Sequence, residues 1–157
     1  MTQTAIAAFD STLQTTNVWL HEIMERMGWV DKHRAYHALR TVLHALRDHL
    51  TVEGTAALAA QLPLLIRGIF FEGWHPAGKP LKARKKDDFL AHVALGFADD
   101  PADAEEVTRA VLGVLADHVS AGEVAHVEHL LPQEIRSFFL PTHRGGGEAD
   151  PIRSLLW

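Results

Sequence analysis

The stretch Gly73 to Pro80, GWHPAGKP, divides the chain into two parts. Its two glycines and two prolines favour turns and interrupt helices. On both sides of it, apolar residues recur at helical spacing, and the two patterns resemble each other. We therefore expect two related helical halves joined by a linker over residues 73–86.

Four helices are expected in the first half, residues 17–72. Residues 1–16 are small and polar and predict a loosely held N-terminal arm or a short helix. Capping side chains, glycines and prolines mark where the helices begin and end. The expected signals are Asn17 as the first N-cap and Gly28 as its stop, a long helix over 33–50, Thr51 as the next cap, Pro63 at the start of the fourth helix and Gly73 at its end.

The second half, residues 87–140, shows the same order of helical segments and capping residues. Asp100 followed by Pro101 predicts an N-cap with a first-turn proline. Ser120 and Glu123 have the spacing of a capping box. No stretch alternates apolar and polar residues as a strand does, so the sequence predicts an all-α fold.

The two halves align without a gap. When residues 35–71 are shifted by 69 positions onto 104–140, 13 of the 37 pairs are identical, and the first helices match at a shift of 70. Leu62-Pro63, for example, falls on Leu131-Pro132. We interpret this as a tandem repeat, with two units of about four helices each packed into one compact pseudo-twofold bundle.

Polar residues retained in both halves are expected to serve the architecture. An aspartate near a helix C-terminus is unfavourable for the helix dipole, so Asp48 and Asp117 need cationic partners. We expect Arg67 and Arg136 to supply them as structural ion pairs, one in each unit. His49 and His118 are expected to cap helix-ending carbonyls.

Composition limits the classes of function. The 157 residues contain no cysteine, which excludes disulfides, thiolate metal sites and cysteine nucleophiles. No apolar run approaches the roughly 18 residues of a membrane span, and residues 1–10 lack the pattern of a secretory signal. The net charge of −5 gives no general attraction to DNA. We expect a cytoplasmic protein that binds neither DNA nor membrane.

The joint pattern of these segments is also that of a known family. The run Ile69-Phe70-Phe71-Glu72-Gly73-Trp74-His75-Pro76, the preceding LPLLIR over 62–67 and the long-helix segment VLHALRDHL over 42–50 resemble the DUF2267 family of uncharacterised bacterial proteins. The resemblance covers roughly residues 17–140. It implies a small helical cytoplasmic protein of unassigned activity, and it supplies no catalytic residues.

Few residues suggest chemistry. His33 and His37 have a ligand spacing on one helix face, and Glu123 and His126 have the spacing found in di-iron bundles. The equivalent positions of the other half carry neither pattern, so a solvated, histidine-rich surface is the preferred interpretation. None of the serines stands in a nucleophile elbow, and no phosphate-binding glycine motif follows a strand. We expect no metal and no cofactor; a catalytic role is disfavoured but stays open.

Two segments are candidates for binding. The linker holds five cations in a chain that is otherwise acidic: Lys79, Lys82, Arg84, Lys85 and Lys86. They predict either a solvated connector or a weak anion site. Residues 141–157 form a glycine-rich spacer and an apolar tail, whose apolar residues are Ile152, Leu155, Leu156 and Trp157. The tail either returns to a groove between the repeats or docks on a protein partner or a second copy.

The sequence thus favours a non-enzymatic helical scaffold or adaptor that acts through protein–protein contacts. The alternative is a small-ligand binding module, with an anion at the basic linker or a metal at the histidine faces.

Overall fold

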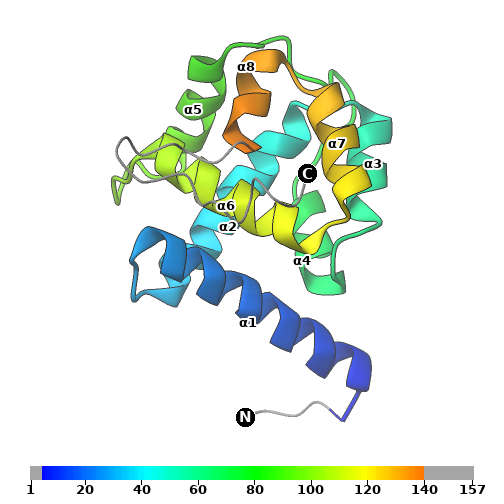
Figure 1. Ribbon diagram of the computed structural model, residues 1–157, viewed down its shortest axis with the longest axis vertical. Helices are drawn as coiled ribbons and strands as arrows, with labels where there is room; N and C mark the ends of the chain where they lie inside the picture. Colours follow the sequence, from blue (N-terminus) through cyan, green and yellow to red (C-terminus); the bar gives the residue numbers. More distant parts are fainter. Residues whose placement is uncertain (1–4, 140–157) are drawn as a thin grey trace, which may run out of the picture.

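A computed structural model of the chain describes residues 5–139, and every element in this range is helical (Figure 1). The all-α prediction is confirmed. The tail residues Ile152, Leu155, Leu156 and Trp157 lie outside the described range. In chain order the elements are α1 (Ala7–Met27), α2 (Lys32–Asp48), α3 (Val52–Ala59), α4 (Leu64–Phe71), α5 (Lys86–Leu95), α6 (Ala104–His118), α7 (Ala121–Leu130), α8 (Gln133–Arg136) and the 3-10 turn η1 (Ser137–Phe139).

Helices α2 and α6 pack against each other at the centre of one hydrophobic core. Three alanines on α2 are fully buried, Ala35, Ala38 and Ala45, and such small side chains let neighbouring helices approach closely. The second half of α1 packs on both central helices and contributes Trp19 to the core. Helix α4 covers α2, α5 covers α6, and α3 lies beside α7.

Three of the predicted capping residues, Gly28, Thr51 and Ser120, end or start helices as expected. Gly28 ends α1 with a positive φ of 69°, a conformation that glycine adopts without strain. The Thr51 hydroxyl accepts a hydrogen bond from the Gly54 N–H at the start of α3, and the Ser120 hydroxyl accepts one from the Glu123 N–H at the start of α7.

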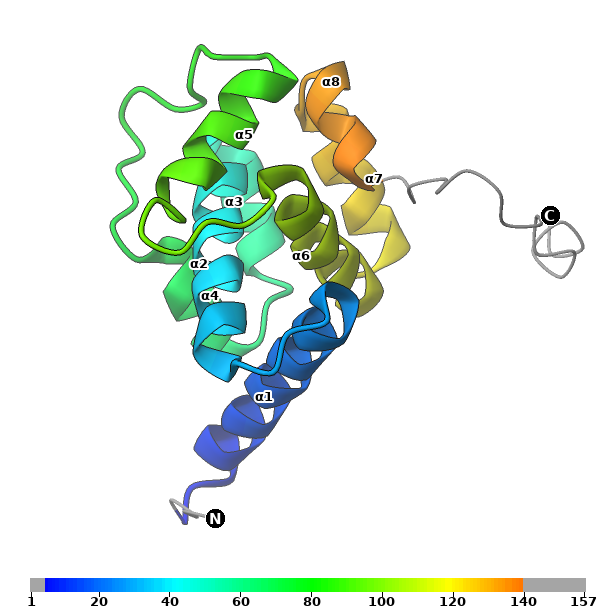
Figure 2. The same ribbon diagram turned by 90° about the vertical axis from the view of Figure 1, so that its left-hand side faces the viewer.

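Helix α1 begins earlier than the sequence predicted. Residues 7–16 belong to it, so of the two predictions for residues 1–16 the helix applies to these residues, as part of α1 and not as a separate short helix, and Asn17 is not an N-cap. The reason is tertiary: the Thr12 hydroxyl accepts a hydrogen bond from the Leu65 N–H of α4, and Thr16 is buried. Both views show the first half of α1 projecting beyond the other helices (Figures 1 and 2).

The start of α6 was also misplaced. Asp103, and not Asp100, provides the cap, because its carboxylate accepts a hydrogen bond from the Glu106 N–H. Asp100 instead lies 3.1 Å from Arg34 Nε, and Pro101 precedes the helix.

The two expected structural ion pairs do not form as such. Arg67 donates its hydrogen bonds to the carbonyl groups of Ala59 and Leu62, and Arg136 donates to that of Leu131. These carbonyls lie where one helix ends before the next begins, and such groups lack a partner within their own helix. Both arginines therefore close helix–helix junctions rather than neutralise an aspartate.

The two aspartates have other partners. Asp48 lies 3.0 Å from Arg47 Nε and 4.0 Å from Lys79 Nζ, so it joins the end of α2 to the linker. Asp117 pairs with Arg26 of α1. The predicted partners Arg67 and Arg136 were wrong.

His49 and His118, which occupy equivalent positions of the two halves, also differ from each other. His49 caps as expected, since its Nδ1 lies 2.7 Å from the Ala45 carbonyl in the last turn of α2. His118 does not cap: its Nε2 lies 2.7 Å from Glu22, and its ring stacks on Trp19.

Arg47 is the most extensively bonded buried charge of the described chain. Its guanidinium donates to the carbonyl groups of Phe70 (2.9 Å) and Glu72 (2.7 Å) as well as to Asp48, and the side chain is only 6% exposed. It thereby fixes the C-terminal end of α4 to the C-terminal end of α2.

We predict that Arg47→Met lowers the free energy of unfolding by about 3–5 kcal/mol, because Asp48 and two carbonyl groups lose a buried donor. Arg47→Lys keeps the charge but loses the planar guanidinium group, so its free energy of unfolding is expected to lie between those of the wild type and Arg47→Met. Urea denaturation followed by circular dichroism measures both. The control Arg84→Met changes an exposed arginine and shifts stability by less than about 0.5 kcal/mol. Equal losses in the Arg47 and Arg84 variants would contradict the role of Arg47.

Candidate functional site

The basic linker does not present its five cations together. Lys79 lies next to Asp48, and Lys86 lies 2.9 Å from Glu105. Lys86 and Arg109 hold the pKa of the Glu105 carboxyl below its usual value, since both donate hydrogen bonds to it. Lys82, Arg84 and Lys85 are exposed. Two of the five cations are therefore engaged within the fold, and three remain for an anion.

The two candidate metal-ligand pairs, His33 with His37 and Glu123 with His126, do not form a metal site. His37 bonds to the Gly96 carbonyl, whereas His33 lines a pocket at the start of α2. Glu123 is half-buried beside its cap and His126 is exposed. Among residues 5–139, no group of three or more His, Asp or Glu side chains is placed to hold a metal ion.

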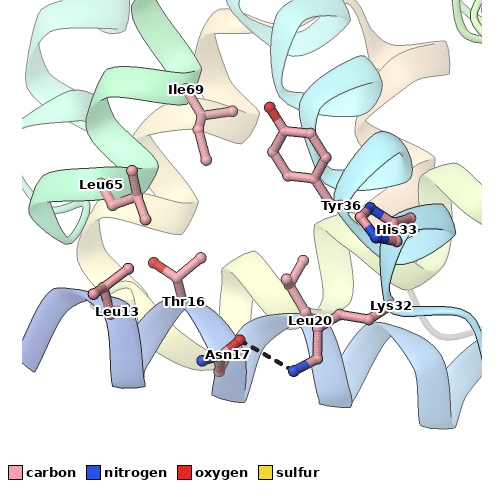
Figure 3. Close-up of a pocket in the computed structure, with 9 residues that line it drawn as sticks. All are labelled: Leu13, Thr16, Asn17, Leu20, Lys32, His33, Tyr36, Leu65 and Ile69. Atoms are coloured by element: carbon pink, nitrogen blue, oxygen red, sulfur yellow. Dashed lines mark hydrogen bonds between the residues drawn. The ribbon is translucent and has the colours of Figure 1, made fainter. Parts of the chain in front are cut away.

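A pocket of about 430 Å³ lies between α1, α2 and α4 (Figure 3). Its walls are largely apolar, with Leu13 and Leu20 from α1 and Leu65 and Ile69 from α4. Polar groups lie along one side, where Lys32 donates to the Asn17 side chain at 3.3 Å. The complete lining is Leu13, Thr16, Asn17, Leu20, Lys32, His33, Tyr36, Leu65 and Ile69.

Local chemistry positions these walls. The Asp31 carboxylate accepts a hydrogen bond from the His33 N–H, so α2 begins beside the pocket and places Lys32 and Tyr36 at its margin. The hydrogen bond between Thr12 and the Leu65 N–H sets α1 against the first turn of α4. The pocket is the space that remains where these three helices diverge.

The apolar lining continues onto the surface of α1. Ile6, at the start of the helix, and Phe9 and Leu13 are 49%, 48% and 43% exposed. Together with Leu20 they follow the i, i+3, i+7 spacing of a single helix face. We call Ile6, Phe9 and Leu13 the α1 face. Leu64 and Leu65 of α4 are also exposed, at 53% and 37%.

The sequence contained a signal for this surface that the prediction did not use. The spacing of Ile6, Phe9 and Leu13 matches the stripe that continues at Leu20. The prediction relied instead on the small and polar character of residues 1–16. The pocket itself depends on the separation of three helices, for which the sequence holds no local signal.

His44 lies behind the pocket wall formed by Ile69. Its Nε2 lies 2.7 Å from the Ile69 carbonyl, and the imidazole is half-buried. Burial lowers the pKa of His44 and outweighs the hydrogen bond, and the charges of Arg47 and Arg40 lower it further. The pKa of His92 is likewise lowered, chiefly by burial.

Residues 16–138 match a family described as "Uncharacterized conserved protein (DUF2267)". The chain belongs to the DUF2267 family. No curated protein matches the chain. The DUF2267 match begins within α1, so the projecting α1 face precedes the matched residues.

The family resemblance predicted from the sequence is thus confirmed. Within residues 5–139, no helix of this DUF2267 protein is both long and apolar enough to cross a membrane.

We predict that the protein loses stability as the pH falls from about 7 to 5, through and below the ordinary histidine pKa of about 6.5. The folded state resists protonation of His44 and His92, whereas the unfolded chain accepts these protons, so acid favours unfolding. His44→Gln removes part of this dependence and gives a smaller loss, as measured by urea denaturation at each pH. The control His126→Gln removes an exposed histidine and keeps the wild-type slope. An unchanged slope in His44→Gln would contradict the assignment.

Proposed function

We propose that this DUF2267 protein is a non-enzymatic helical scaffold or adaptor of the cytoplasm that binds another protein chain. The observation that carries the proposal is the continuous apolar surface formed by the α1 face, the pocket and the exposed leucines of α4. A contiguous apolar surface of this kind is typical of an interaction site. A groove between helices that an apolar helix face can fill is a recurring mode of protein recognition.

We also propose that the scaffold is a duplicated four-helix unit. Helices α3 and α7, and likewise α4 and α8, begin 69 residues apart. Arg67 donates to the Leu62 carbonyl, and Arg136 donates to the Leu131 carbonyl at the equivalent position. Both pairs support a common ancestral unit.

The helix contacts support a twofold relation between the units. If α1 corresponds to α5 and α2 to α6, such a relation requires contacts to occur in matched sets. Helix α1 packs on α6 and α5 packs on α2; α1 also packs on α2, as α5 does on α6. The equivalent helices α2 and α6 pack on each other, as do α3 and α7.

The small-ligand alternative receives less support. An anion would meet Lys82, Arg84 and Lys85 without Lys79 and Lys86, whose ammonium groups face carboxylates. Exposed lysines of this kind lack the convergent hydrogen bonds of a built anion site. Protein contact therefore remains the preferred function.

We predict that Leu65→Glu reduces the amount of any specific partner captured from a lysate of the source organism by at least about tenfold, since it places a charge at the mouth of the apolar pocket. Affinity purification with quantitative mass spectrometry measures the loss. Val30→Glu is the matched control, because Val30 is 96% exposed and is not among the pocket residues. A partner counts only when Val30→Glu retains it and Leu65→Glu loses it. Partners captured equally by both variants would contradict the proposed surface.

A further inference from the structure

The apolar stripe of α1 extends past the body of the protein. Its second half is buried, with Leu20 only 6% exposed and Ile23 fully buried. Its first half carries the α1 face, in which each side chain is at least 43% exposed. One end of this helix face is thus buried in the protein, and the side chains at the other end are largely exposed to solvent.

The charges of α1 favour self-association. From Ile6 to Leu20 the only charged residue is Asp10. A twofold interface sets the same surface opposite itself, so a face with several like charges would repel its copy. The α1 face has no such obstacle. Depletion of charge around exposed apolar side chains is also characteristic of interface cores.

We propose that two copies of the chain pair through their α1 helices in antiparallel fashion, with Ile6 and Phe9 of each copy covering the pocket of the other. This inference rests on the proposed function, because it names the partner of the same surface.

The spacing of the residues fits this arrangement. Ile6 lies seven residues before Leu13, and Leu20 lies seven residues after it. A twofold axis near Leu13 therefore brings Ile6 of one copy to Leu20 of the other and Phe9 to Asn17, and both Leu20 and Asn17 line the pocket.

A membrane surface fits the same helix less well. Helices that lie on membranes carry lysine or arginine on their polar face, which attracts acidic lipids. Residues 6–20 contain neither. The second copy is therefore the occupant that the composition favours.

The first test is sedimentation equilibrium of the full chain. The expected result is a dimer of twice the 17.4 kDa chain mass. Phe9→Glu raises the dissociation constant by about 30-fold or more, because it places a charge against the apolar pocket of the other copy. Val18→Glu is the matched control: Val18 is on the same helix and is 44% exposed, but it points away from the α1 face.

A second measurement uses the wild-type chain and does not depend on a variant. In a mixture of isotope-labelled and unlabelled copies, intermolecular nuclear Overhauser effects are expected between the ring of Phe9 in one copy and the methyl groups of Leu65 and Ile69 in the other. Their absence in a dimeric sample would overturn the inference.

Two further outcomes would also overturn it. One is a chain that stays monomeric at every concentration. The other is a dimer that survives Phe9→Glu but is lost with Leu156→Glu, which would assign the contact to the tail. Either outcome overturns the dimer without deciding the proposed function. The capture experiment with Leu65→Glu tests that function separately, because a chain that does not pair through α1 can still bind another protein at the pocket.

Discussion

The buried guanidinium of Arg47 is the constraint on which much of the first half depends. A charge that is almost fully removed from water is tolerated only when its hydrogen bonds are satisfied, and here two backbone carbonyls and one carboxylate satisfy them. Both carbonyls belong to the C-terminal end of α4, so Arg47 determines where α4 ends relative to α2. The position of Ile69, and with it one wall of the pocket, follows from this bond network. Asp48 extends the network to the linker, since its carbonyl accepts the Leu81 N–H at 2.8 Å and its carboxylate lies near Lys79.

Local chemistry explains which parts of the fold were predictable. Gly28, Thr51 and Ser120 end or start helices through bonds made within a few residues, so their role is readable from the sequence. The partners of Asp48 and Asp117 are not local in this sense. Arg26 is 91 residues from Asp117, and only the crossing of α1 over α6 brings them together. The prediction chose arginines that recur in both halves, but those arginines satisfy carbonyl groups at helix junctions, a need that every such junction has.

The candidate site was less predictable than the fold. The sequence directed attention to the linker cations, the histidines and the tail. The structure engages two of the cations internally and bonds His37 to the Gly96 carbonyl, whereas His33 lines the pocket. The tail lies outside the described residues. The pocket arises from the angles between α1, α2 and α4, which sequence periodicity does not encode. What the sequence did hold was the regular spacing of Ile6, Phe9 and Leu13, because a stripe that continues a buried face belongs to the same helix.

In the proposed repeat, the two units differ at the position of Leu65, which lines the pocket. Position 65 of the first unit corresponds to position 134 of the second. There Glu134 accepts a hydrogen bond from the Lys86 N–H at 2.7 Å and so satisfies the first turn of α5, which has 10 residues. Leu65 carries no such acceptor; its own N–H donates to Thr12, and α1 continues past it to a length of 21 residues. The stretch before α5 holds Gly78 and Pro80, which interrupt helices, whereas residues 7–15 of α1 contain neither glycine nor proline. Helix α1 therefore continues past the first turn of α4 and exposes an apolar face. In the proposed architecture, duplication supplies the stable core, and this local difference supplies the surface that we propose binds a second chain.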